Sequence, residues 1–217
     1  AAVQGNGVWG YINRDGEVIS CQYDAAGDFS EGLAAVEKDG KWGYIDKTGK
    51  VVIPLQFDCA YSFQEGLAAV EIDDKLGYVN TAGELVIPPQ YEASLHDDEY
   101  DYDYTYVWDF SEGLALVYRL DEKGVPRCGY IDKTGKEVIP CQYDSGSVFF
   151  CGLAAVEQNG KEGFVDKTGR LVVPFEKYDV VWNIWGGLGV VIEESYPDWK
   201  FGLMDQTGRE VVPCEYD

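Results

Sequence analysis

The sequence predicts an all-β protein made of six tandem three-stranded antiparallel meanders. Three observations predict this class. A unit of about 34 residues recurs six times in the 217-residue chain, most clearly between Phe29 and Ala60. Its apolar runs are short and rich in Val, Ile and Tyr, and glycine turns separate them, which is typical of strands. Repetition of one small unit predicts a single repeat domain over residues 1–217. The expected units span residues 1–28, 29–62, 63–109, 110–148, 149–183 and 184–217.

Four anchors define the unit. The first is a core glycine inside an aromatic strand, at Gly10, Gly43, Gly77, Gly129, Gly163 and Gly202. A turn of the form Asp/Asn-x-x-Gly follows, and then a hydrophobic stretch that ends in proline in five of the units. An aromatic-acid pair such as Phe57-Asp58 comes next, and a Gly-Leu pair opens the following apolar run.

The second unit illustrates the strands that we expect. They cover Leu33–Val36, Trp42–Ile45 and Val51–Ile53, joined by short glycine loops in which a positive φ is easily adopted. The runs are apolar almost throughout, so each small sheet is expected to be covered on both faces by its neighbours. Gly43 should allow a close approach to the backbone. Pro54 is expected to end the third strand, and the next residues form either a fourth, outer strand or a crossing segment.

The order of elements parallels the blade of a WD-type propeller, in which a small-residue strand lies innermost. The favoured architecture is therefore a propeller-like toroid of six short blades. The alternative is an open superhelix, or solenoid, of stacked β-hairpins, which needs no closure.

Composition excludes several kinds of partner. The 39 acidic residues outnumber 17 basic ones, for a net charge of −22. Phosphate backbones and anionic membranes require Lys and Arg, so nucleic acid is excluded as a ligand. No stretch is long and apolar enough for a transmembrane segment. The six cysteines lack a CxxC pattern and are expected to be reduced and structural. The compartment stays open between a secreted or cell-surface location and the cytoplasm.

The strand Lys41–Asp46 and its relatives resemble the WG repeat family, also called KWG repeats, found mainly in bacterial proteins. The resemblance covers nearly the whole chain. It implies a binding or surface-associated role and supplies no catalytic residues. Four units depart from the Trp-Gly pattern, with Leu76, Cys128, Glu162 and Phe201 in place of tryptophan.

Individual function should lie where the copies differ, and the largest difference is an insertion before Gly113. Alternating acids and aromatics in it would occupy opposite sides of an extended strand. The predicted partner-binding residues there are Asp97, Asp98, Glu99, Tyr100, Asp101, Tyr102, Asp103, Tyr104, Tyr106 and Trp108. Its carboxylates also make calcium an alternative ligand, although the ordered EF-hand pattern is missing. Two tryptophans in an irregular patch, Trp182 and Trp185, are predicted to bind the same partner.

No catalytic or metal constellation emerges. His96 is the single histidine, so no histidine pair is present for zinc. The recurring turn aspartates and the aromatic-acid pairs are expected to cap turns. No metal or cofactor is predicted apart from the calcium alternative.

The sequence therefore predicts a noncatalytic platform for a protein or glycan partner on a rigid β-repeat scaffold. Two alternatives remain at this point. One is a glycoside-acting enzyme with paired carboxylates about 5–10 Å apart. The other is a structural spacer between other domains of a longer protein.

Overall fold

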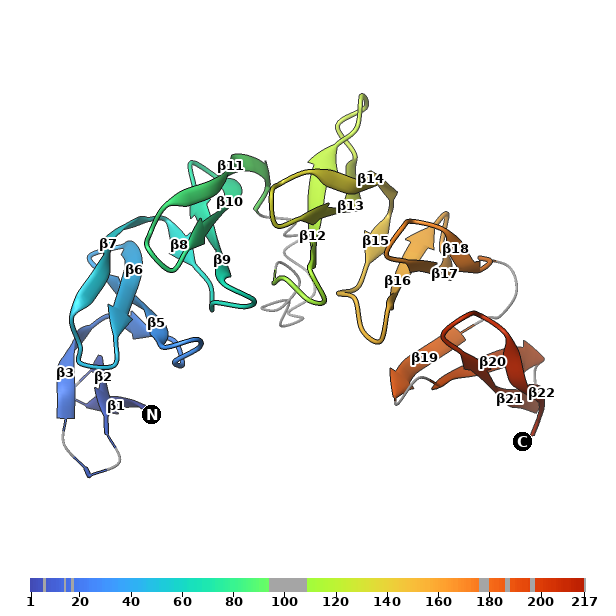
Figure 1. Cartoon of the computed structure of the whole chain (residues 1–217), viewed down its shortest axis with the longest axis horizontal. Helices are drawn as coiled ribbons and strands as arrows, with labels where there is room; N and C mark the ends of the chain where they lie inside the picture. Colours follow the sequence, from blue (N-terminus) through green and yellow to red (C-terminus); the bar gives the residue numbers. More distant parts are fainter. Residues whose placement is uncertain are drawn as a thin grey trace. The chain divides into compact units, whose positions relative to one another are not determined.

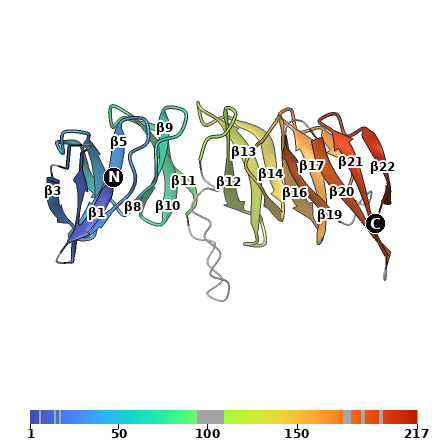
Figure 2. The same cartoon turned by 90° about the horizontal axis from the view of Figure 1, so that it is seen from below.

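The computed structural model describes residues 1–5, 7–13, 15–16, 18–93, 109–175, 180–185, 188–195 and 198–216. All regular elements among them are β-strands, which form six antiparallel sheets of sequentially adjacent strands (Figures 1 and 2). The predicted all-β class with repeated antiparallel meanders is confirmed. The described residues contain no helix that is long and apolar enough to span a membrane.

The chain divides into two compact units, and the first comprises Ala1–Phe110 with Lys133–Gly135. Its first sheet contains β1 (Ala2–Gly5), β2 (Val8–Ile12) and β3 (Val18–Tyr23). The second contains β4 (Ala25–Ala26), β5 (Leu33–Lys38), β6 (Lys41–Asp46) and β7 (Val51–Phe57). The third contains β8 (Cys59–Ala60), β9 (Leu67–Ile72), β10 (Lys75–Asn80) and β11 (Leu85–Glu92).

The second compact unit comprises Ser111–Asp132 and Lys136–Asp217. Its fourth sheet contains β12 (Leu114–Leu120), β13 (Pro126–Asp132) and β14 (Glu137–Tyr143). The fifth contains β15 (Ser145–Gly146), β16 (Leu153–Gln158), β17 (Lys161–Asp166) and β18 (Leu171–Val173). The sixth contains β19 (Val180–Trp185), β20 (Leu188–Ser195), β21 (Asp198–Asp205) and β22 (Glu210–Tyr216).

The third strand does not end at its proline, which corrects the expectation for Pro54. Strand β7 continues to Phe57, and the register jumps from the pair Tyr44 and Ile53 to the pair Trp42 and Phe57. One residue of β6, Gly43, therefore faces three residues of β7, which is a β-bulge. Pro54 lies inside this bulge on the edge strand of its sheet and has no register partner in β6, which is a position where proline is tolerated in a sheet.

The bulge explains why the core position of the unit is occupied by glycine. A Cβ on Gly43 would lie 2.6 Å from the carbonyl oxygens of both Ile53 and Pro54. The equivalent Cβ at Gly129 would lie 2.4 Å from the carbonyl oxygen of Ile139. The expected close approach at this glycine is confirmed, and the approaching group is the backbone of the glycine's own sheet.

A fourth strand joins four of the described sheets at the edge opposite the bulge. It follows the aromatic-acid pair and is only two residues long in β4, β8 and β15. Each short strand pairs with the first long strand of the next meander, for example Ala25 with Glu37. The fourth strand expected from Gln56 to Asp58 is therefore wrong, because Gln56 and Phe57 continue β7 and the short strand that follows Asp58 belongs to the next sheet.

Neighbouring sheets pack through two distinct faces. We call the face of the second sheet that bears Tyr44, Ile53 and Phe57 its forward face; it packs against Ala68, Val70 and Val79 of the third sheet. Ala68, Val70 and Val79 correspond by register to Ala34, Val36 and Ile45 of the second sheet. We call the face that bears these residues the backward face of each sheet. The forward face of the first sheet packs on the backward face of the second in the same way. The fifth and sixth sheets repeat the arrangement. The prediction of cover on both faces is confirmed for the second sheet, which packs on the first sheet and on the third.

The tyrosine after each core glycine fastens the next segment. Tyr44 is fully buried, and its hydroxyl donates to the carbonyl oxygen of Tyr61 at 2.7 Å. Its ring lies 4.8 Å from that of Phe63, centroid to centroid. Burial raises the pKa of Tyr44, so the hydroxyl stays protonated and remains a donor. The second compact unit repeats this arrangement with Tyr130, Ser147 and Phe149.

The recurring turn aspartates cap backbone, as predicted. In Asp46, one carboxylate oxygen accepts hydrogen bonds from the N–H groups of Thr48 at 2.8 Å and Lys50 at 3.1 Å. Asp166 and Asp205 make the same contacts and also accept from a threonine hydroxyl. That hydroxyl is the main cause that lowers the pKa of each to about 2.

Replacing Gly43 with alanine should strongly destabilise the fold. The added Cβ would meet two carbonyl oxygens at 2.6 Å, so the bulge would have to move. Overpacking of this kind costs about 1–3 kcal/mol of unfolding free energy. Urea denaturation followed by circular dichroism measures the loss.

The matched control is Gly27→Ala. Its Cβ would meet its nearest neighbour, the carbonyl oxygen of Ala35, at 3.7 Å, which is ordinary contact. We expect a change within about 0.5 kcal/mol. Equal stability losses in the two variants would contradict the structural explanation of the core glycine.

Replacing both Asp166 and Asp205 with asparagine should reduce the amount of unfolding free energy that is lost at acidic pH. Both carboxylates have a folded-state pKa of about 2, below the ordinary 3.8. The stabilisation that they contribute is therefore complete above pH 3.8 and is lost as the pH falls toward 2. Asparagine still accepts the backbone bonds, as Asn80 does from Ala82 and Glu84. Unfolding free energies at pH 7 and pH 3 should differ less in the variant than in the wild type; an unchanged difference would refute the assignment.

Candidate functional site

The predicted insertion site lies outside the described residues. This concerns Asp97, Asp98, Glu99, Tyr100, Asp101, Tyr102, Asp103, Tyr104, Tyr106 and Trp108, and the calcium alternative that depends on them. Trp182 and Trp185 fall on β19, where Trp182 pairs with Val190 and Trp185 with Leu188. This irregular patch thus supplies a six-residue fourth strand in place of the two-residue strand of other sheets.

The acids of the aromatic-acid pairs have structural partners. Asp58 accepts a hydrogen bond from the N–H of Asp73 at 2.9 Å and forms an ion pair with Lys41. Asp144 likewise accepts from the N–H of Asn159 and pairs with Arg127. Each acid therefore ties its own sheet to the hairpin turn of the next, which confirms the structural interpretation.

The Ser-Glu-Gly turns form a second structural ladder. In the first compact unit, the Glu31 carboxylate accepts from the N–H of Gly66 at 2.9 Å. In the second, Glu112 accepts from the N–H of Gly152 at 2.9 Å and pairs with Lys167 at 2.9 Å. These recurring glutamates therefore link successive turns and are not candidates for a catalytic pair.

Asp109 is the described carboxylic acid that most resembles a catalytic acid. Burial raises its pKa to about 6, and no second carboxylate in the described part of the chain contributes to that shift. Its charge instead acts on the phenols of Tyr44 and Tyr78, whose pKa values rise chiefly because they are buried. Glycoside hydrolysis needs two carboxyl groups about 5–10 Å apart, so Asp109 meets only half of that requirement.

Thiol and metal chemistry have equally little support in the described chain. Burial raises the pKa of Cys128 to about 12 and that of Cys141 to about 11, so both thiols are protonated at neutral pH. Across the described ranges, no three His, Cys, Asp or Glu side chains gather in a way that would hold a metal ion.

The tip of the β12–β13 hairpin is the described feature that most clearly departs from the repeat. Leu120 and Val125 flank the turn and are 50% and 41% exposed. Asp121 caps this turn by accepting from the N–H groups of Lys123 at 2.8 Å and Val125 at 2.9 Å. We call residues 120–125 the hairpin tip; Figure 1 shows it extending beyond the other strands of its sheet.

The charge network at the base of the hairpin tip holds it in place. Hydrogen bonds from Val125 and Lys123 are the main causes that lower the pKa of Asp121. Arg127 lies between Asp121 and Asp144 and pairs with both. Sequence reasoning did not select this tip, although Gly129 follows Val117 by twelve positions, where most units have seven.

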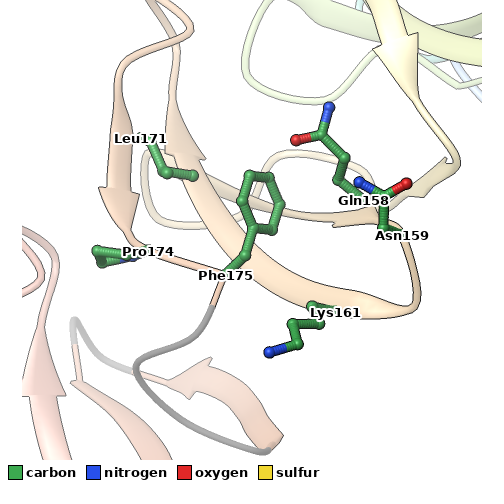
Figure 3. A pocket seen from close by; sticks show the side chains of 6 residues that line it. All are labelled: Gln158, Asn159, Lys161, Leu171, Pro174 and Phe175. Carbon is green, nitrogen blue, oxygen red and sulfur yellow. The ribbon is translucent and has the colours of Figure 1, made fainter.

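The fifth sheet carries a surface hollow of about 420 Å³. It is lined by Gln158, Asn159, Lys161, Leu171, Pro174 and Phe175. Figure 3 shows the Phe175 ring between Leu171 and the amide side chains. Among the described residues, this lining contains one charged side chain, that of Lys161, and no carboxylate, thiol or imidazole.

Comparison with solved structures shows the type of fold. Hsv2 of Kluyveromyces lactis has a TM-score of 0.51 at 11% identity, over 100% of this chain and 75% of that one. The WD40 β-propeller domain of Doa1 has a TM-score of 0.39 at 17% identity, and the match covers 96% of this chain and 77% of that one. TolB of Acinetobacter baumannii has a TM-score of 0.39 at 14% identity, and the match covers 94% of this chain and 58% of that one. The chain is all-β and consists of repeated antiparallel sheets, as the sequence predicted.

Sequence comparison identifies the repeat itself. No curated protein matches the chain significantly. The model described as WG containing repeat matches seven times, over residues 9–42, 42–75, 77–95, 100–123, 129–161, 163–194 and 201–217. These matches include the core glycines and bulges of successive sheets and cover most of the sequence. The chain therefore belongs to the WG-containing repeat family.

Proposed function

We propose that this protein is a noncatalytic platform that binds a protein partner through the hairpin tip. The observation that carries the proposal is the pair of exposed aliphatic side chains, Leu120 and Val125, on a turn that Asp121 and Arg127 hold rigid. Binding residues are often found on loops that a rigid scaffold positions. A pre-ordered tip also loses little conformational entropy on binding.

The polar residues of the repeats support a scaffold rather than an enzyme. The turn aspartates, the acids of the aromatic-acid pairs and the described turn glutamates Glu31 and Glu112 are engaged by backbone N–H groups. These hydrogen bonds give each of the carboxylates a role in the structure of the repeat, which supports a scaffold. Asp109 has the raised pKa of an acid catalyst but lacks a partner carboxylate among the described groups that affect it.

The chemistry of the hairpin tip favours a protein over a glycan. Leu120 and Val125 are aliphatic and offer no aromatic plane on which a sugar ring could stack. Protein interfaces bury an apolar centre inside a polar rim, and charged residues 121–123 provide such a rim beside the two side chains. A protruding, irregular element of this kind also argues against a plain structural spacer.

Replacing both tip residues with serine, in the variant Leu120→Ser/Val125→Ser, should weaken partner binding at least about tenfold. A loss of about 1.4 kcal/mol of binding free energy weakens binding tenfold, and burial of one such side chain contributes about 1.5–3 kcal/mol. Partners captured by the wild-type protein would be identified by mass spectrometry. Biolayer interferometry with the purified partner then gives the dissociation constants of wild type and variant.

The matched control is Val51→Ser/Val52→Ser on β7. These valines are 40% and 37% exposed, so the control removes a similar amount of apolar surface from another element. We expect the control to bind like the wild type. Wild-type affinity in the tip variant, with an unchanged circular dichroism spectrum, would rule out the tip as the binding surface.

Deleting residues 97–106 examines the insertion predicted from sequence. The deletion variant should fold, and any retention on a glycan array that depends on the insertion should be lost, because the deletion removes four tyrosines and five acids that the rest of the chain does not replace. Calorimetry with calcium examines the alternative ligand. Unchanged glycan retention would count against a glycan site there, and absence of heat at millimolar calcium would count against the ion.

A further inference from the structure

The hollow on the fifth sheet receives an aromatic ring from one departure of this unit from the repeat. Phe175 directly follows Pro174, whereas the residues after the prolines of the other units are not aromatic: Leu55, Pro89, Cys141 and Cys214. Strand β18 ends at Val173, so Phe175 lies in a turn outside the sheet. Its ring covers the core glycine, since a Cβ on Gly163 would lie 2.9 Å from a ring carbon. The fifth unit therefore places an aromatic wall where the other units have smaller side chains.

A second departure supplies two carboxamide groups to the same hollow. Gln158 and Asn159 occupy the hairpin turn where the second unit has Lys38 and Asp39. The φ angles of Asn159 and Asp39 are 56° and 54°, so the turn keeps its conformation. Two charged side chains of the repeat are thus replaced by two neutral ones, each of which both donates and accepts hydrogen bonds.

The register places these groups on one face of the fifth sheet. Lys161, Gly163 and Val165 alternate along β17 and share a face. Gln158 pairs with Lys161, and Leu171 pairs with Val165, so both belong to the same face. Phe175 covers Gly163 between them, as Figure 3 shows. Two separate departures from the repeat therefore meet at one hollow of about 420 Å³.

Contacts with the fourth sheet hold the walls of the hollow in place. The partly buried Phe175 ring lies 6.3 Å from that of Tyr143, centroid to centroid. The N–H of Asn159 donates to the carboxylate of Asp144, which fixes the hairpin turn. A site with fixed walls loses little conformational entropy when it binds a ligand.

The charges around the hollow favour a neutral ligand. Its described lining has no carboxylate, and the protein's net charge of −22 disfavours an anion. Lys161 belongs to the repeat, since its equivalents Lys41 and Lys75 form ion pairs with Asp58 and Glu92. We therefore assign Lys161 no role in binding. The volume of the hollow falls in the range of small-molecule sites, about 300–1,000 Å³.

We propose that the hollow binds an uncharged hexopyranose unit of a glycan. The C–H groups on one side of a pyranose ring stack on the face of Phe175, which carries negative charge density. The sugar hydroxyls donate to and accept from the carboxamides of Gln158 and Asn159. A wholly apolar ligand would bury these carboxamides without partners, which is unfavourable. The site is separate from the hairpin tip, so it adds a glycan-binding role that does not depend on the proposed function.

Saturation-transfer NMR on the 217-residue protein is the first measurement. The probes are the methyl pyranosides of glucose, galactose and mannose at millimolar concentration, with glucuronate as the charged comparison. At least one neutral glycoside should receive saturation from the protein and bind more tightly than glucuronate. Absence of transfer to all three neutral glycosides, or tighter binding of glucuronate, would overturn the proposal.

Two variants restore the residues of the second unit and are therefore expected to fold. Phe175→Leu introduces the residue found at position 55, and Gln158→Lys/Asn159→Asp introduces those found at positions 38 and 39. The first removes the aromatic face, and the second removes both carboxamides. Each should bind the preferred glycoside at least about fivefold more weakly in an NMR titration.

The matched control is Phe150→Leu, which alters another phenylalanine of the second compact unit. Phe150 is 51% exposed and lies outside the lining of the hollow. This control and the variant that lacks residues 97–106 should both bind the glycoside like the wild type. Wild-type affinity in Phe175→Leu, with an unchanged circular dichroism spectrum, would refute the site. Loss of affinity in the deletion variant alone would assign the sugar to the insertion instead.

Discussion

The close approach of each third strand to a core glycine is the constraint on which the repeat depends. Without a Cβ at Gly43, β7 can bulge over β6 and bring Phe57 opposite Trp42. The aromatic ring enters the forward face, and the next residue, Asp58, reaches the following hairpin turn. The neighbouring tryptophan is replaceable, since Leu76 and Cys128 are fully buried at its place whereas Glu162 is exposed. Of the Trp-Gly pair, the glycine is therefore the residue that the geometry of the bulge requires.

The repeat uses its polar groups to hold sheets in register, which separates stability from function. Hydroxyls, carboxylates and turn N–H groups join neighbouring sheets within each compact unit through contacts that recur along the chain, as with Tyr44, Asp58 and Glu31. A residue engaged in this way cannot change without loosening a junction between sheets. Elements that protrude from the stack are free of this constraint, and the hairpin tip is such an element in the described chain. The sequence of the tip can therefore vary at little cost to the fold, which is compatible with the proposed binding role.

Most of the unit was predictable because its determinants are local. Strand positions followed from short apolar runs, the Asp46 turn from its spacing to glycine, and cover on both faces from the near-continuous apolarity of Leu33–Val36. The course of β7 beyond Pro54 was not predictable, because a proline breaks a ladder only where its missing N–H would face another strand. Whether the missing N–H would face another strand depends on the position of β7 at the edge of its sheet, which is a feature of the tertiary structure. The exposure of Leu120 likewise depends on the tertiary arrangement, although the length of its connection was visible.

The edges and faces of the sheets differ in their capacity for association. Edge strands β7 and β11 expose Val51, Val52, Leu85 and Val86, and a bare edge of this kind invites pairing with another chain. In each, the bulge at the proline interrupts the regular array of donors and acceptors within a few residues, so a long ladder cannot form. The faces have no such interruption, since their contacts are between side chains and match a complementary set. The bulge that shapes each unit therefore also limits the pairing of its edge strand with another chain.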